Sequence, residues 1–137
     1  MTGWILLVEA DAVLGAVLSE VLRHNGYEVI LVRTLMNVDI KRFDSVNAVI
    51  LDIDTTSAEK ELGWLDERHH DDDESLPIVL MGLQSPQELR HRLGLHHRGL
   101  QQANALTLVQ KPFRNEELLA AVRQAHENCL PERANGM

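Results

Sequence analysis

The stretch NAVILDIDTT, residues 47–56, decides the fold of this 137-residue chain. Its apolar residues follow one another without polar alternation, and several of them are β-branched. Such a run is typical of a strand that is buried on both faces, as in the middle of a parallel sheet. The residues that follow such a strand lie at the carboxyl edge of the sheet, where open α/β folds keep their sites. Asp52 and Asp54 are therefore predicted at that edge; the simpler alternative is that they only end the strand and solvate a loop.

Strand-like and helix-like segments alternate on both sides of this stretch. Strands are predicted at 4–8, 27–32, 48–53, 78–81 and 106–109, and helices at 12–24, 34–43, from 57 to the polar run at 69–74, from 86 towards 94–99, and from 115 to about 129. This order implies parallel strands joined by right-handed crossovers in a three-layer sandwich. The predicted fold class is α/β: a five-stranded parallel sheet between helices. Residues 1–130 are expected to form one domain, and 131–137 a frayed tail or the start of a linker.

Local signals set several helix ends. Asp11 is placed to cap the first helix, and Asn25-Gly26 supplies a left-handed stop after it. The sequence Ser85-Pro86-Gln87-Glu88 is a capping box with proline at the first helical position, which is a strong helix start.

Composition limits the classes of function. The formal net charge of −8 argues against a surface that binds nucleic acid or an anionic membrane. One cysteine, Cys129, excludes an internal disulfide framework and suits a reducing compartment. Since no apolar run is long enough to span a membrane or resembles a signal peptide, a cytoplasmic protein is expected.

Four acids and one lysine lie at the ends of predicted strands. Glu9 and Asp11 come after the first strand, Asp52 and Asp54 lie at the end of the third, and Lys111 comes after the fifth. Clustered carboxylates repel one another unless a cation compensates them, and oxygen ligands at this density favour Mg²⁺. The lysine adds a second positive group for a phosphoryl anion. One carboxylate held in this way could attack phosphorus and become an acyl phosphate.

Four motifs occur in this order and spacing: ILLVEAD (5–11), AVILDID (48–54), LPIVLMG (76–82) and QKPF (110–113). With these motifs, residues 4–129 resemble the receiver domains of bacterial two-component response regulators. The resemblance implies the flavodoxin-like (βα)5 fold of that family.

This resemblance implies a signalling role rather than an enzyme, beyond catalysis of the domain's own aspartyl phosphorylation. Asp52 would accept a phosphoryl group from a sensor histidine kinase or a phosphotransfer protein, and Lys111, joined to Pro112 by a cis bond, would contact that group. Mg²⁺ would be held by Glu9, Asp52 and the backbone carbonyl of Asp54, with Asp11 adding charge. The face of the fourth helix, fifth strand and fifth helix would serve for output contacts or a homodimer. No other cofactor, no membrane and no direct nucleic-acid binding is expected.

Departures from the family pattern predict an atypical receiver. Ala10 replaces the second acid after the first strand, which is usually the principal metal ligand, so Mg²⁺ binding should be weak. Gly82 stands where the family has a threonine or serine, and Leu108 where it has an aromatic switch residue. Thr56 replaces a usual proline, and the segment 84–105 is longer than typical. Phosphorylation should therefore be slow and coupled weakly to any change of state.

Two other functions stay open at the level of sequence. The first is a phosphorylation-independent pseudo-receiver that acts as an interaction or dimerisation module. The second is an aspartate-nucleophile phosphatase of haloacid-dehalogenase type, because DIDTT (52–56) resembles its DxDxT motif. Against the phosphatase, that motif normally opens its domain, and no cap or late acidic metal motif follows here.

Two surface features also allow more than one interpretation. Arg90, Arg92 and Arg98 make the fourth helix basic, which indicates either a solvated face or a partner surface. The pairs His69-His70 and His96-His97 are poor candidates for a metal site, because adjacent side chains on a helix point apart.

Overall fold

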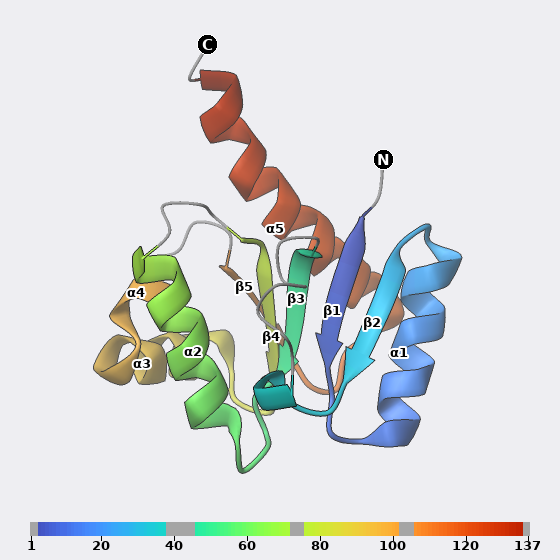
Figure 1. Cartoon of the computed structure of the whole chain (residues 1–137), viewed down its shortest axis with the longest axis horizontal. Coiled ribbons are helices and arrows are strands. Elements are labelled where there is room, and N and C mark those ends of the chain that lie inside the picture. Colours follow the sequence, from blue (N-terminus) through green and yellow to red (C-terminus); the bar gives the residue numbers. More distant parts are fainter. Residues whose placement is uncertain (1–2, 38–45, 72–75, 102–105, 136–137) are drawn as a thin grey trace.

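Five parallel strands form one sheet at the centre of the computed structural model, which describes residues 3–37, 46–71, 76–101 and 106–135 (Figure 1). The strands are β1 (Trp4–Val8), β2 (Glu28–Val32), β3 (Val46–Asp52), β4 (Ile78–Gly82) and β5 (Leu106–Gln110). Their order across the sheet is β2-β1-β3-β4-β5, and each neighbouring pair is parallel. The strand that contains Asp52 therefore lies in the middle, as its continuous apolar sequence predicts.

Helices cover both faces of the sheet, so the predicted three-layer arrangement is confirmed (Figure 1). One face carries α1 (Ala12–His24) and α5 (Asn115–Asn135). The other carries α2 (Ala58–Asp71), α3 (Pro86–His96) and α4 (Arg98–Gln101). A short 3₁₀ turn, η1 (Leu35–Asn37), follows β2. No helix in the described ranges is both long and apolar enough to cross a membrane.

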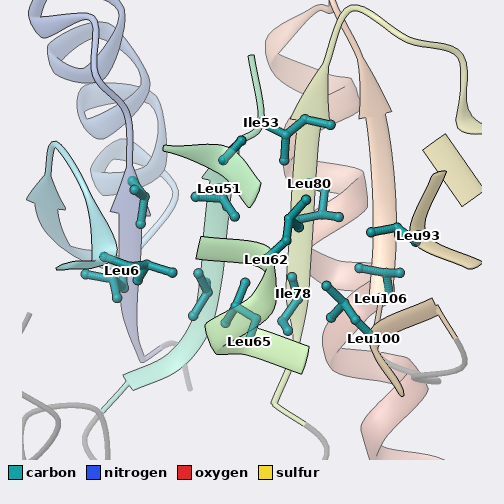
Figure 2. Close-up of a cluster of buried hydrophobic side chains, with 14 of the residues drawn as sticks. Leu6, Leu51, Ile53, Leu62, Leu65, Ile78, Leu80, Leu93, Leu100 and Leu106 are labelled. Atoms are coloured by element: carbon teal, nitrogen blue, oxygen red, sulfur yellow. The ribbon is translucent and has the colours of Figure 1, made fainter. Parts of the chain in front are cut away.

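The central strand divides its side chains between two apolar clusters. Leu51 and Ile53 face α2, α3 and α4 (Figure 2), and Val49 belongs to the same cluster. Ala48 and Ile50 face α1 and α5. All five are at most 2% exposed. Successive residues of a strand point to opposite faces, so an unbroken apolar run is what a two-sided core requires. Burial of each large side chain contributes about 1.5–3 kcal/mol, which holds the carboxyl end of β3 in a fixed position.

The predicted helix signals operate as expected. The Asp11 side chain accepts hydrogen bonds from the N–H groups of Val13 and Leu14 at 2.9 and 3.1 Å, and Gly26 adopts a φ of 93° after the end of α1. Ser85 and Glu88 form both halves of the capping box at the start of α3. Such caps supply hydrogen-bond partners to backbone groups that would otherwise lack them. Each cap contributes about 1 kcal/mol to stability.

Three segments differ from the sequence-based expectation. Of the helix expected at 34–43, the structure describes only η1, and the remainder lies outside the described residues. The fourth helix is divided at His97, whose N–H still binds the carbonyl of Leu93 while its ring contacts α2. The tail expected from Pro131 is instead helical as far as Asn135.

Candidate functional site

Asp52 is the last residue of β3 and lies at the carboxyl edge of the sheet, where it was predicted. The residue is 5% exposed. Its Oδ1 accepts hydrogen bonds from the backbone N–H of Asp54 and from Lys111 Nζ, both at 2.9 Å. A buried carboxylate with two donors, one of them cationic, is stabilised in its ionised form.

Lys111 reaches the site from the end of β5. Its backbone N–H donates to the carbonyl of Gly82 at 2.8 Å, which fixes the start of the loop after β5. The peptide bond between Lys111 and Pro112 is cis, as the resemblance predicted. The ammonium group lies 2.9 Å from Asp52 Oδ1 and 3.4 Å from Asp54 Oδ2, so one lysine joins two carboxylates.

Glu9, directly after β1, is the most enclosed acid of the site at 2% exposure. Its Oε2 accepts a hydrogen bond from the N–H of Asp11 at 3.2 Å, whereas its Oε1 is buried without a hydrogen-bond partner. Burial, together with the neighbouring Asp52 carboxylate, raises the pKa of Glu9 to about 7. At neutral pH this carboxyl group therefore carries a proton in a substantial fraction of molecules.

Asp52 and Lys111 hold each other in their charged forms. Burial alone would raise the pKa of Asp52, but the Glu9 side chain, the N–H of Asp54 and the Lys111 ammonium outweigh it and lower that pKa below its usual value. Burial alone would also lower the pKa of Lys111, yet Asp52 and the other nearby carboxylates hold it above the usual value. The site therefore keeps an ionised aspartate beside an ionised lysine at neutral pH.

The four predicted metal ligands have unequal roles in the structure. Glu9 and Asp52 face each other, while the Asp11 carboxylate is engaged in capping α1. The Asp54 carboxylate binds the N–H of Leu83, with Oδ2 at 3.0 Å. Within the described ranges, no three His, Cys, Asp or Glu side chains form a group that could hold a metal ion.

The donor set nevertheless suits a hard cation in kind. Carboxylate and carbonyl oxygens are the ligands that Mg²⁺ takes, and the buried Oε1 of Glu9 has no other partner. Glu9, Asp52 and the backbone carbonyl of Asp54 are the groups that would hold such an ion. Ala10 contributes no ligand, so only two side chains are available to it.

Position 82 explains the missing hydroxyl in physical terms. A Cβ at Gly82 would lie 2.7 and 2.9 Å from Cγ1 and Cδ1 of Ile53, closer than van der Waals contact permits. Ile53 thus fills the space into which a side chain at position 82 would point. The sequence showed the glycine but gave no sign that Ile53 excludes a larger residue.

The basic helix is partly committed to contacts inside the protein. Arg92 forms an ion pair with Glu59 of α2 and donates to Gln84 Oε1 at 3.1 Å. His97 Nε2 lies 3.2 Å from the other oxygen of Glu59. Asp66, seven residues after Glu59 in α2, accepts a hydrogen bond from the N–H of Leu100 at 2.7 Å. Of the three arginines considered for a partner surface, Arg92 therefore has an internal role, whereas Arg90 and Arg98 are exposed.

A buried carboxylate near the site was not anticipated from the sequence. Glu61 of α2 is 1% exposed and accepts hydrogen bonds from Thr34 Oγ1 at 2.9 Å, the N–H of Leu35 at 2.8 Å and Ser57 Oγ at 3.2 Å. It joins the turn after β2 to the loop that follows Asp54. A glutamate in a helix usually faces water, so the sequence did not predict that Glu61 is buried. The only sign in the sequence is that Thr34 and Ser57, whose hydroxyl groups can donate to it, each stand next to an apolar residue.

No family model and no curated protein matches the sequence, but many solved structures share its fold. NtrX from Brucella abortus has a TM-score of 0.76 at 20% identity, over 99% of this chain and 30% of that one. The signal receiver domain of a putative LuxO repressor from Vibrio parahaemolyticus gives 0.72 at 19% identity, over 98% and 97% of the two chains. The chemotaxis response regulator CheY4 of Vibrio cholerae gives 0.71 at 17% identity, over 91% and 99%.

These likenesses confirm the predicted fold. The chain has the flavodoxin-like (βα)5 architecture of response-regulator receiver domains. It spans less than a third of NtrX, whereas it covers nearly the whole of the single receiver domains. At these identities the likeness concerns the fold alone.

Proposed function

We propose that this chain is a receiver domain of two-component signalling and that Asp52 is its phosphoacceptor. The observation that carries the proposal is the contact of 2.9 Å between Asp52 Oδ1 and Lys111 Nζ at the carboxyl edge of a receiver-type sheet. An ionised carboxylate beside a fixed ammonium group supplies both a nucleophile and a positive partner for a phosphoryl group. In this proposal the chain acts as a signalling domain, and its only catalysis is its own modification.

The chemistry follows from the arrangement of the Asp52 oxygens. The backbone N–H of Asp54 and the ammonium group of Lys111 both donate to Oδ1 of Asp52. We therefore assign the other oxygen, Oδ2, as the attacking atom. Its bond to phosphorus forms as the bond between phosphorus and the donor's nitrogen or oxygen breaks, and the electron pair of that bond leaves with the donor. Lys111 then neutralises part of the charge on the transferred phosphoryl oxygens.

Magnesium belongs to this proposal as a weakly bound ion. Mg²⁺ would offset charge on the phosphoryl oxygens during transfer. Glu9 and Asp52 would bind it through carboxylate oxygens, and Asp54 through its backbone carbonyl. With Ala10 in place of a third carboxylate, and with a proton competing for Glu9, its affinity is expected to be low.

A second candidate is a pseudo-receiver that acts through protein contacts without phosphorylation. The closeness of Ile53 to Gly82 favours it, because no hydroxyl side chain can report the state of Asp52 from that position. A modification without differential contacts cannot shift a conformational equilibrium. The phosphatase alternative has no comparable support, since Asp54 is engaged by Leu83 and Lys111 rather than free to act as a general acid.

The partners proposed for this chain follow from its role. A sensor histidine kinase or a phosphotransfer protein would supply the phosphoryl group, and the surface of α3, α4, β5 and α5 would serve output or a homodimer. Such a chain would act in the cytoplasm, without direct contact to nucleic acid or membrane.

Labelling of the purified protein tests the proposal. The wild type is incubated with Mg²⁺ and a small phosphodonor, and its intact mass is followed with time. We expect slow addition of one phosphoryl group, absent from Asp52→Asn and strongly reduced in Lys111→Ala. Ala10→Asp, which restores a carboxylate, should bind Mg²⁺ more tightly and label faster. An unlabelled wild type together with an unlabelled Ala10→Asp variant would favour the pseudo-receiver.

A further inference from the structure

The Asp54 side chain has the surroundings of a bound anion. Its Oδ2 and Oδ1 lie 3.0 and 3.3 Å from the backbone nitrogen of Leu83, which donates its N–H to them. On another side, Lys111 Nζ lies 3.4 Å from Oδ2. The side chain is only 25% exposed. A main-chain N–H and an ammonium group that converge in this way form an oxyanion-binding position, and the chain's own carboxylate occupies it.

This position is adjacent to the proposed nucleophile. The lysine that contacts Asp54 also binds Asp52 Oδ1 at 2.9 Å, so both carboxylates share one cation. Asp54 also lies against the end of β4, since a Cβ at Gly82 would be 3.5 Å from its Oδ1. An anion attached to Asp52, or bound beside it, would share the Lys111 ammonium with Asp54 and would compete with it for the Leu83 N–H, which has a single proton to donate.

We propose that the Asp54 carboxylate is an internal anion that occupies the phosphoryl-binding position beside Asp52. Inorganic phosphate, and the phosphoryl group itself, then bind only by displacing it from Leu83 and Lys111. The second part of this inference rests on the proposed role of Asp52 as phosphoacceptor, whereas the first part needs only the contacts of Asp54. In this proposal Asp54 has two roles: its side chain blocks the phosphoryl-binding position, and its backbone carbonyl would bind Mg²⁺.

Direct binding of inorganic phosphate tests the first part. The probe is titrated into the wild type, Asp54→Asn and Asp54→Ala, and the Leu83 amide resonance is followed by NMR. Asparagine keeps the shape of the side chain and an oxygen for the Leu83 N–H, but it removes the charge; alanine empties the position. We expect phosphate to bind both variants at least about tenfold more tightly than the wild type, because a like charge at contact distance is removed. Glu28→Gln removes one charge at the opposite edge of the sheet, at the start of β2, and should leave the affinity unchanged.

Labelling by a small phosphodonor with Mg²⁺ tests the second part. Asp54→Asn should label at Asp52 about tenfold faster than the wild type, since a competing carboxylate is gone. Equal phosphate affinity in the wild type and both variants, with equal labelling rates, would overturn the inference and leave the phosphoacceptor proposal intact. Tighter phosphate binding by the variants with no labelling of any protein would overturn the phosphoacceptor proposal and support the internal anion.

Discussion

Glu9 is the residue at which burial and charge oppose each other most clearly. Its carboxyl group is 2% exposed, faces Asp52 and has one oxygen without a hydrogen-bond partner. An ionised Glu9 would place a second negative charge beside Asp52 in a poorly solvated region. When no metal ion is bound, a proton on Glu9 relieves that repulsion, and this couples folding to pH.

We therefore expect Glu9 to give the metal-free protein a specific pH dependence. Its pKa is about 7 in the folded state against an ordinary 4.5, so the native state binds the extra proton. The resulting stability is fully present below pH 4.5 and is lost as pH rises through about 7. Asp52, whose pKa is lowered, acts in the opposite sense and only as pH falls below its ordinary value of 3.8.

Urea unfolding in chelator at pH 5 and pH 8 measures this effect. Glu9→Gln cannot titrate, so its free energy of unfolding should change less between the two pH values than that of the wild type. The exposed Glu28→Gln variant should keep the wild-type dependence. If Glu9→Gln retained the full wild-type difference, the proton would be bound elsewhere.

A side chain at position 82 should be tolerated only when Ile53 is shortened. Gly82→Ala places a methyl group 2.7 Å from Ile53 Cγ1, and such overpacking costs about 1–3 kcal/mol. In Ile53→Ala the same change should cost much less, which gives a coupling free energy of about 1 kcal/mol or more. Gly63→Ala is the matched control, because its new Cβ would meet nothing nearer than His97 Cε1 at 3.9 Å. Additive free energies in the double mutant, measured by urea unfolding, would contradict the steric explanation.

Among the elements, α2 binds α3 and α4, the two helices that follow β4. Glu59 binds Arg92 and His97, and Asp66 binds the N–H of Leu100. Apolar contacts support these bonds, since Leu62 and Leu65 of α2 lie in the same cluster as Leu93 and Leu100 (Figure 2). His97, which separates α3 from α4, is therefore held in place by its contact with α2.

Two neighbouring arginines of α3 should differ in their effect on stability. Arg92→Ala removes the ion pair with Glu59 and should lower the free energy of unfolding by about 1 kcal/mol, typical of a partly shielded pair. Arg90 is exposed, and Arg90→Ala should change it by less than about 0.5 kcal/mol. Chemical denaturation of both variants checks the difference. Equal losses would indicate helix propensity rather than the ion pair.

At the scale of the whole molecule, α3 and α4 present two exposed arginines on a chain whose net charge is negative. Arg90 and Arg98 are exposed, and Leu95 of α3 is 64% exposed. If this face meets a second copy or an acidic partner, Arg90→Glu with Arg98→Glu should weaken association, and more so at low salt. Sedimentation at two salt concentrations measures the effect. Arg23→Glu with Arg33→Glu, which reverses two exposed arginines outside α3 and α4, serves as a control of equal charge. Unchanged hydrodynamic size at every salt concentration would leave the face as solvated surface.

The sequence predicted the sheet because its strand segments are short, apolar and separated by clear helix signals. The Asp52, Lys111 and Glu9 positions followed from the same pattern, since residues after parallel strands share one edge. Contacts that depend on side-chain conformation were not predictable: the ring of His97 on Glu59, the Ile53 side chain over Gly82, and the Asp54 carboxylate on Leu83. Each contact joins residues that are distant in sequence. The periodicity of apolar residues predicts helices and strands, but it does not predict such contacts between side chains.

The buried carboxylate of Glu61 has a consequence for how this protein opens locally. The N–H of Leu35 is bound by a side chain of α2 rather than by a backbone carbonyl. Its amide proton can exchange with solvent only when that side chain withdraws or when α2 itself detaches. A short turn after an edge strand would ordinarily exchange within the fastest class of amides. Here we expect the Leu35 amide to exchange together with the amides of α2, so that the turn and the helix form one cooperative unit of opening.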